Sequence, residues 1–562
     1  MSAATGLRTQ FAVSVRLTVL TPAGEQVFQV PVGTSVRDAL DLTELRVRAA
    51  CGGTGGCGAC GLTLIGGAVT PPTTAEYMKL PAAERAQGVR LACQMRLQGD
   101  ARVRIDDPAP PSQWCSIPSE NLIPSPGALP QLDKHVYGVA VDLGTTHIRL
   151  ALWNRKTGQR IATRRGPNPQ GAFGADVLNR LAAARDNPER AAELAKLART
   201  AIIQAVRDIL KRDVGEVTPM LKEIGELVVV GNTAMLALLS GCGGEQLLDP
   251  VHWAGRVDCQ PTDRGAFQAQ WFMPNARIHL ADAVAGFIGS DLLADLLVTR
   301  LTESAGGALL LDVGTNTELA LWDGARLHVT AVPGGPAFEG VGLRNGMAAE
   351  TGAICRVRHS GCRPASPEKG IPFGHADFSF ETVAGTPARG FCGSGLVDAV
   401  AVLLSAGKLK PSGRFVVSPG KDGFLLDPDN PRTALFSQDI DTFQRAKAAT
   451  AAAMAALLQR AGMGWSDIRR LCVCGAFGHR LGIAHAQSLG LLPPLDPARI
   501  ELFADASLAG AEIGLLHPDA GAATFAALGE RITALNLAQV SDYDDRYIDH
   551  LRLRPIDLNK SA

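Results

Sequence analysis

The sequence has no excess of charge, because its 55 lysine and arginine residues balance 55 aspartate and glutamate residues over 562 positions. This balance provides no global field toward nucleic acid or an anionic membrane, so any partner surface must be local. No segment approaches the roughly 18 uncharged apolar residues of a membrane helix, so we expect no membrane association. Residues 1–20 lack a basic head followed by an unbroken apolar run, which predicts a cytoplasmic protein.

Four of the twelve cysteines form a group whose spacing indicates metal ligation. Three lie in a glycine-rich stretch and the fourth follows about thirty residues later, the plant-type ferredoxin arrangement, here with five rather than four residues in the first gap. Glycine permits backbone with positive φ and lets N–H groups approach the sulfurs, as a loop around an iron-sulfur cluster requires. We therefore predict a [2Fe-2S] cluster held by Cys51, Cys57, Cys60 and Cys93. The alternatives are four unrelated thiols or a zinc site, which usually shows two C-x2-4-C knuckles.

Local patterns around the cysteines predict a small β-rich domain. Residues 13–32 alternate about a turn, which indicates a β-hairpin, and Ser35 is placed to cap a short helix. Residues 62–65 are typical of a strand, and Gly66–Gly67 predicts a turn after it. The segments CGGTGGCGAC and RLACQ resemble the β-grasp ferredoxin domains that are fused to larger proteins. We assign residues 1–106 to this domain.

A proline-rich linker is expected at residues 107–136, because residues 107–130 are rich in proline and serine and have no periodicity. Asp133, His135 and Gly138 match D-x-H-x-x-G, the pattern by which cobalamin-binding domains supply a histidine to cobalt. A strand that leads into a phosphate loop follows, in place of the βα repeat of such a domain. We therefore interpret His135 as a surface histidine.

The body of the chain contains an internal duplication at residues 137–153 and 307–322. Each copy is an apolar strand, then Asp-x-Gly-Thr-[Thr/Asn], then a second alternating strand. Backbone N–H groups and hydroxyls at the tip of such a hairpin bind phosphate oxygens, while Asp142 or Asp312 holds Mg²⁺ or its water. One such motif alone would be an ordinary turn, but two facing hairpins clamp a nucleotide. The predicted catalytic residues are Asp142 and Asp312, and the predicted nucleotide ligands are Gly144, Thr145, Thr146, Gly314, Thr315 and Asn316.

A third glycine-rich element supports a nucleotide site. In residues 471–482 an apolar strand leads into Gly475 and Gly478, which let backbone approach a purine or ribose closely. Together the three elements resemble the actin-like ATPase superfamily, which includes actin and acetate kinase. This resemblance implies a multidomain α/β protein in which two RNase H-like lobes, residues 137–304 and 305–545, bind ATP in their cleft. Residues 546–562 then form a C-terminal tail.

Further motifs resemble the ferredoxin-fused reductive activators of corrinoid proteins along nearly the whole chain. They are NPQGAFGADVLNRL at 168–181, VVVGNTAML at 228–236, GPAFEG at 335–340, CGSGLVDAV at 392–400 and ASLAGA at 506–511. The resemblance implies an ATP-dependent electron-transfer enzyme that passes one electron to a corrinoid methyl-carrier protein and restores Co(I) from inactive Co(II). It also implies Mg²⁺ as a cofactor, a homodimer and a role for Asn232 in nucleotide binding. The chain departs from the family at His147, Thr317 and Asp505, which leaves open its nucleotide affinity and hydrolysis rate.

Two other functions stay open at this point. One is an ATP-dependent activator of another low-potential reductase, and the other is a small-molecule kinase with a fused redox domain. No G-x-G-x-x-G opens a helix after a strand, so we expect no flavin or NAD site and an external electron donor, either a reductase or a ferredoxin. Glu339 is a candidate for a place near Mg²⁺ or an interface, whereas Cys472 and Cys474 alternate on a strand and are expected in the core.

Overall fold

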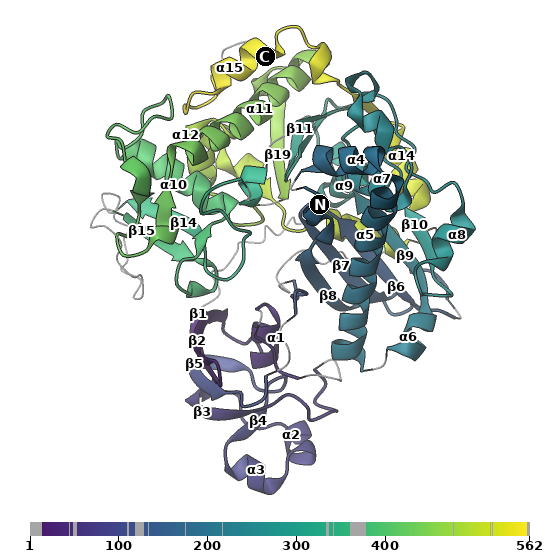
Figure 1. Ribbon diagram of the computed structural model, residues 1–562, viewed down its shortest axis with the longest axis vertical. Helices are drawn as coiled ribbons and strands as arrows, with labels where there is room; N and C mark the ends of the chain where they lie inside the picture. Colours follow the sequence, from purple (N-terminus) through teal and green to yellow (C-terminus); the bar gives the residue numbers. More distant parts are fainter. Residues whose placement is uncertain are drawn as a thin grey trace. The chain divides into compact units, whose positions relative to one another are not determined.

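The computed structural model describes most of the chain as two compact units (Figure 1). The first unit contains the residues up to Ser116 together with Leu210–Glu216 and Ala384–Thr386, and the second contains the rest. The described residues are 14–43, 45–48, 53–108, 112–117, 129–132, 134–174, 176–215, 217–332, 336–340, 342–359, 378–475, 477–517, 519 and 521–558.

The first unit is a five-stranded sheet in the order β2-β1-β5-β3-β4. Strands β1 and β2 are antiparallel and β1 is parallel to β5, which is the arrangement of a β-grasp domain. Buried apolar side chains such as Leu17, Leu40 and Val103 form its core. Its elements are β1 (Ser14–Thr21), β2 (Gly24–Pro31), α1 (Val36–Asp41), β3 (Gly61–Val69), α2 (Thr74–Lys79), α3 (Ala82–Ala86), β4 (Val89–Leu91) and β5 (Leu97–Arg104).

Two of the local predictions for this unit are confirmed and one is wrong. The hairpin is β1–β2, and the Ser35 hydroxyl caps α1 by accepting a hydrogen bond from Asp38 N at 3.1 Å. The predicted turn at Gly66–Gly67 is wrong, because β3 continues through both glycines to Val69 with two irregularities in its pairing to β5. Gly67 has φ +117° and a Cβ there would overlap Asp100 O, so these glycines permit bulges rather than a turn.

Two neighbouring residues of the predicted linker, Ser116 and Ile117, form hydrogen bonds, each within its own unit. Within the first unit, Ser116 N donates to Asp41 O at 2.9 Å. Within the second unit, Ile117 N donates to Thr163 Oγ1 at 3.1 Å. The parts of the linker at residues 109–111 and 118–128 lie outside the described residues.

The second unit begins with a lobe built on the sheet β10-β9-β6-β7-β8. Its strands are β6 (Tyr137–Leu143), β7 (His147–Asn154), β8 (Gln159–Pro167), β9 (Ile224–Gly231) and β10 (Arg277–Leu280). The long helix α5 packs along β7 and β8 (Figure 1). The helices of this lobe are α4 (Val177–Asp186), α5 (Pro188–Ile209), α6 (Thr218–Glu223), α7 (Thr233–Ser240), α8 (Arg264–Ala269) and α9 (Ser290–Thr299).

The other lobe is built on the sheet β20-β19-β11-β12-β13-β21, with small sheets β15-β14-β16 and β17-β18 beside it. Its main strands are β11 (Gly307–Val313), β12 (Thr317–Trp322), β13 (Leu327–Val332), β19 (Ile468–Gly475), β20 (Ile500–Leu502) and β21 (Ile532–Ala534). The shorter strands are β14 (Ala353–His359), β15 (Phe378–Thr382), β16 (Gly390–Phe391), β17 (Phe424–Leu425) and β18 (Ala434–Leu435). The helices are α10 (Gly393–Ser405), α11 (Ser437–Ala461), α12 (Ile483–Leu489), α13 (Ala506–Leu516), α14 (Ala522–Gly529) and α15 (Tyr543–His550).

The two lobes repeat one topology, as the duplicated sequence predicts. In each lobe the first strand pairs antiparallel with the second and parallel with a strand much later in the chain, β6 with β9 and β11 with β19. The third strand of each lobe continues the antiparallel meander. This is the two-lobed RNase H-like fold. Cys472 and Cys474 are at most 1% exposed in the core beneath the hairpins, which confirms that they are buried thiols.

None of the helices in the described part of the chain is long and apolar enough to cross a membrane.

The C-terminal segment after α15 is anchored on helix α11. Gln444 Nε2 donates to Leu551 O at 2.7 Å, and Lys447 Nζ donates to Arg552 O at 2.6 Å. Lys447 is 1% exposed, and its burial, together with the charge of Arg554, lowers its pKa to about 7. The ammonium group therefore opposes folding wherever it is protonated.

We expect the free energy of unfolding to depend on pH through Lys447. Because its folded pKa of about 7 lies below the ordinary 10.5, the unfolded chain binds more protons between these values, so stability rises with pH across that window. One group contributes at most about 1.4 kcal/mol per pH unit. Urea unfolding between pH 7 and 9, followed by tryptophan fluorescence, should show this slope in the wild type and a smaller slope in Lys447→Met. Equal slopes would contradict the assignment.

Candidate functional site

The described cysteines of the predicted cluster lie in the first unit, on the loop before β3 and just after β4. Cys51 lies outside the described residues, and Cys57 is exposed. Cys60 and Cys93 are both buried, with their Sγ atoms 3.4 Å apart. The fold thus brings together two thiols that are 33 positions apart in the sequence.

Hydrogen-bond donors and a positive charge surround the Cys93 sulfur. Gln94 Nε2 lies 3.5 Å from Cys93 Sγ and donates to Gly53 O at 2.8 Å. The hydrogen bond from Cys60 lowers the pKa of Cys93, and Gln94 and the charge of Arg37 act in the same direction. At Cys93 this environment favours the thiolate, which is the form of cysteine that ligates iron. The same hydrogen bond, together with burial, raises the pKa of Cys60.

The glycines of the loop have the conformation that a cluster cradle needs. Gly53, Gly55 and Gly58 have φ values of +84°, +79° and +71°, and a Cβ on Gly55 would lie 2.7 Å from Ala75 Cβ. With Cys51 outside them, the described residues contain no set of three or more His, Cys, Asp or Glu side chains arranged around a metal ion. The buried thiol pair, the donors and the glycine backbone nevertheless fit a [2Fe-2S] cluster.

The second unit contains a polar cleft into which both hairpin tips point. The predicted site residues that line it are Asp142, Gly144, Thr145, Asn232, Asp312, Gly314, Thr315, Asn316 and Gly475. Thr146 bonds to a lining residue, whereas Gly478 is not among the described residues that line the cleft. Within the described part of the chain, the buried Nδ2 of Asn316 has no hydrogen-bond partner, so the cleft offers a ready donor to a ligand.

The two hairpin tips meet through their threonines and Glu339. Thr146 Oγ1 and Thr315 Oγ1 lie 3.1 Å apart, and both hydroxyls donate to Glu339 Oε2, the former at 2.8 Å. Glu339 belongs to a short 3₁₀ turn, Pro336–Glu339, in the second lobe. One carboxylate oxygen therefore links the two copies of the phosphate loop.

Asn232 contacts the tip of the first hairpin, which contains Thr145. It caps α7 by accepting a hydrogen bond from Met235 N at 3.1 Å, and its Nδ2 donates to Thr145 Oγ1 at 3.0 Å. Arg180 Nη1 donates to Thr145 O at 2.8 Å. The tip is thus held in place from two elements of the first lobe, and Asn232 acts on the site by positioning Thr145.

A group of buried carboxylates surrounds the floor of the cleft. Its members are Asp142, Asp291, Asp295, Asp312 and Glu318. Burial raises the pKa of Asp142 to about 6 and that of Asp312 to about 7, and the charge of Asp142 adds to the effect on Asp312. Burial also raises the pKa values of the other three well above their ordinary range. So many anions in one buried place require protons or a cation.

The two copies of the phosphate loop differ in the residue that faces the aspartate across the hairpin. Asp142 is paired with Arg149, whose Nη1 lies 3.1 Å from Asp142 Oδ2, whereas Asp312 is paired in register with Glu318. The first aspartate therefore has its own counter-ion. The second has a like charge beside it.

Arg149 also forms an ion pair with Asp505, with Nε 3.0 Å from Oδ1. Asp505 precedes α13 with φ +52°, a left-handed conformation that aspartate and asparagine tolerate better than most residues. Asp505 departs from the family pattern, and the negative charge that it adds is offset by Arg149.

Sequence reasoning missed several residues that line the cleft, namely Arg149, Asp291, Glu318 and Ser507, and it named Asp505 only as a departure from the family pattern. Two of these residues, Arg149 and Glu318, could have been predicted from the sequence. The register of a tight hairpin places them opposite Asp142 and Asp312. Asp291 had a weaker signal, because it is one of two aspartates in the mostly apolar helix α9. Ser507 and Asp505 reach the cleft only through the tertiary fold.

These features define a class of protein, an ASKHA-type ATPase fold joined to a ferredoxin domain. Sequence models of three families match consecutive parts of the chain: the 2Fe-2S iron-sulfur cluster binding domain at residues 20–98, the RACo middle region at 137–304, and the C-terminal domain of RACo, the ASKHA domain, at 307–561. The chain belongs to the RACo family. It therefore has a [2Fe-2S] cluster domain and an ATP-binding ASKHA domain.

Individual proteins are similar over much of this chain. The corrinoid activation enzyme RamQ of Eubacterium limosum is 28% identical over 69% of this chain, and the match spans 65% of RamQ. The [Co(II) methylated amine-specific corrinoid protein] reductase of Methanosarcina barkeri is 27% identical over 66% of this chain and 69% of that protein. A solved structure of a reductive activator for corrinoid,iron-sulfur protein matches 97% of this chain and 100% of that chain, with 25% identity and a TM-score of 0.63.

We expect Gly475→Ala to weaken nucleotide binding at least about tenfold, or about 1.4 kcal/mol. Gly475 has φ +86°, and an added Cβ would overlap Asp312 Oδ1 and Val313 O, so the aspartate must move. Gly529→Ala, at the end of α14, is the control because an added Cβ there has nothing within 4 Å. Isothermal titration with a non-hydrolysable ATP analogue measures both affinities. Equal affinities for the two variants would mean that Asp312 is not part of the nucleotide site.

Proposed function

We propose that this chain is an ATP-dependent activator that passes one electron from its [2Fe-2S] cluster to a corrinoid protein and converts inactive Co(II) to Co(I). The observation that carries the proposal is the presence, in one chain, of a ferredoxin-type cysteine cradle and a cleft where two phosphate-loop tips share one carboxylate. Three proteins named for action on corrinoid proteins are similar to it over at least 66% of its length, which supports the same substrate class.

ATP has a thermodynamic task in this proposal. A plant-type cluster supplies electrons near about −400 mV, and reduction of a tightly held Co(II) corrinoid is expected to be uphill from there. For one electron, each 59 mV is a factor of ten, about 1.4 kcal/mol, so a gap of about 120 mV requires roughly 2.8 kcal/mol. Differential binding of ATP to one conformation provides a free energy of this size through a population shift.

Glu339 is the group on which we expect ATP to act. Its carboxylate accepts hydrogen bonds from the hydroxyls of Thr146 and Thr315, which are also the predicted phosphate donors. Because a phosphate oxygen and Glu339 are both anionic and use the same two donors, nucleotide binding would separate Glu339 from the tips. We infer that the conformation in which the tips hold phosphate instead of Glu339 is the one that engages the corrinoid partner.

We place Mg²⁺ at the second hairpin rather than the first. Asp142 already has Arg149 as a counter-ion, whereas Asp312 faces Glu318. Mg²⁺ prefers carboxylate and water oxygens, and its two charges would offset the charges of Asp312 and Glu318. Arg149 then remains available for a phosphate oxygen, to which its planar guanidinium is suited.

The electron donor to the cluster is external in this proposal, because the chain has no flavin or NAD fingerprint. A reductase or a ferredoxin would supply the electron. The homodimer implied by the resemblance stays a prediction.

The placement of Mg²⁺ predicts unequal effects of two matched substitutions. In Asp312→Asn the Mg²⁺ concentration for half-maximal binding of an ATP analogue should rise about tenfold or more, because a metal-facing carboxylate is lost. In Asp142→Asn the rise should be smaller, because Arg149 already offsets that carboxylate. Titration of Mg²⁺ at a fixed analogue concentration measures both. Equal increases would contradict a metal at the second hairpin.

The function itself is tested by reduction of corrinoid methyl-carrier proteins held as Co(II), with the activator kept reduced by dithionite. We expect Co(I) absorption to appear with wild type and Mg-ATP, at least about tenfold more slowly with Asp312→Asn, and not with Cys93→Ser. Equal rates with and without ATP in all three proteins would overturn the proposal. ATP-dependent phosphorylation of a small acceptor would instead favour the kinase, and ATP-dependent reduction of only a non-corrinoid reductase would favour the other activator.

A further inference from the structure

Arg37 lies directly against the loop that carries the predicted cluster ligands. It belongs to α1 and is 4% exposed. A Cβ added to Gly53 would lie 2.8 Å from Arg37 Nη1 and 3.9 Å from Cys93 Cβ. The guanidinium therefore sits beside the cradle, where glycine provides the room for it.

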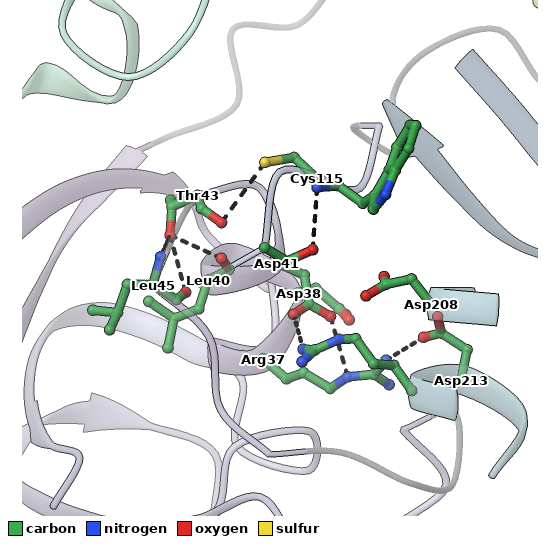
Figure 2. Close-up of polar contacts among 12 residues, drawn as sticks. Arg37, Asp38, Leu40, Asp41, Thr43, Leu45, Cys115, Asp208 and Asp213 are labelled. Carbon is green, nitrogen blue, oxygen red and sulfur yellow. Dashed lines mark hydrogen bonds and ion pairs between the residues drawn. The ribbon is translucent and has the colours of Figure 1, made fainter. Parts of the chain in front are cut away.

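The charge of Arg37 is balanced by two carboxylates of the same unit (Figure 2). Asp41, one turn later on α1, has Oδ2 3.3 Å from Arg37 Nε, and Asp213 forms an ion pair with Arg37 Nη2. Arg212 Nη2 lies 2.5 Å from Asp41 Oδ1. All four side chains are at most 10% exposed, so solvent screens them poorly and each charge acts on its surroundings at low dielectric.

Asp213 and Arg212 come from a distant part of the sequence. They belong to the short π-helix Leu210–Val214, which the contacts assign to the first unit. Leu210 follows directly on Ile209, the last residue of α5. The counter-charge of Arg37 is thus carried by the chain that continues the long helix of the first ATPase lobe.

A buried chain of hydrogen bonds connects the first phosphate loop to α5. Asn168 Nδ2 donates to Gly144 O at 2.9 Å and lies 3.2 Å from Gln170 Oε1. Gln170 Nε2 donates to Leu194 O, in α5, at 3.0 Å. Asn168 and Gln170 are 5% and 0% exposed, so this connection is shielded from water. A movement of the phosphate loop at Gly144 can therefore be transmitted to α5 through these hydrogen bonds.

We propose that Arg37 is a positioning residue that sets the reduction potential of the cluster, and that Asp213 makes this potential respond to nucleotide bound at the first phosphate loop. The nucleotide part rests on the proposed function. Reduction adds negative charge to the cluster, so the positive charge of Arg37 favours the reduced form and Asp213 offsets that effect. The structural alternative is that the ion pairs only hold Leu210–Val214 in place.

An electrostatic role and a merely structural role of Arg37 and Asp213 predict different signs for the change in the ratio of reduced to oxidised cluster. At a fixed ambient potential, Asp213→Asn should raise the ratio of reduced to oxidised cluster at least threefold, and Arg37→Gln should lower it at least threefold. A threefold change corresponds to about 28 mV for one electron. Arg37→Lys keeps the charge and should stay close to wild type. A merely structural role would give shifts of the same sign in all variants or none.

The experiment uses the full-length protein with its cluster, poised with dithionite and redox mediators, and measures the reduced fraction by electron paramagnetic resonance. Arg102→Gln and Glu25→Gln are matched controls, because they remove the same charges from an ion pair whose partners are about half exposed. They should change the ratio less than threefold. If Arg37→Gln does not fold, the sign of the shift in Asp213→Asn decides, and an unshifted Arg37→Lys shows that the charge is sufficient. A shift in Asp213→Asn no larger than that in Glu25→Gln would overturn the proposal.

The nucleotide arm adds a non-hydrolysable ATP analogue with Mg²⁺ to the same samples. The wild-type ratio should change at least threefold, while Asp213→Asn and Gln170→Leu should show no change although they still bind the analogue. An unchanged wild-type ratio with analogue bound would overturn the nucleotide link. No corrinoid protein is present in these measurements. A failure of corrinoid reduction and a failure of this proposal are therefore distinguishable.

Discussion

Asp142 and Asp312 are the next-to-last residues of the first strands of two duplicated hairpins, and the sheets that carry them bury both carboxylates at one cleft. Buried anions in such proximity oppose folding unless protons, arginine or a cation offset their charge. Arg149 offsets the first aspartate, whereas the residue that faces the second across its hairpin is another carboxylate, Glu318. This constraint explains the cleft of the second unit. Two sheets hold the carboxylates close together, and a ligand that carries a cation would offset their repulsion.

The first unit uses the same principle of compensated burial. Arg37, Asp41, Arg212 and Asp213 are buried together with no net charge, beside the loop that carries the cysteines. Such a network is costly to break because each side chain would leave a buried charge unpaired. The network also responds to small movements, because a shift of one charged side chain changes the electrostatic field at the cysteine loop.

The parts of the fold that could be predicted are those specified by local patterns. The hairpins follow from alternation over a few residues, and the Ser35 cap follows from one short motif. The failure at Gly66–Gly67 has a physical cause: glycine permits both a turn and a bulge, and pairing with β5 selects the bulge. Glu339 could only be a weak candidate, because its contacts to Thr146 and Thr315 join segments 24 and 193 positions away.

By itself, the sequence determined which residue types carry the chemistry: spaced cysteines in glycine-rich backbone, and two aspartates in duplicated hairpins. Spacing along the chain is sufficient for this, because each motif is a local unit of a few residues. Only the tertiary structure decided how charges from distant segments are matched, with Asp505 beside Arg149 and Asp213 beside Arg37. Electrostatic energy depends on distance and burial in space, and neither can be read from separation in sequence.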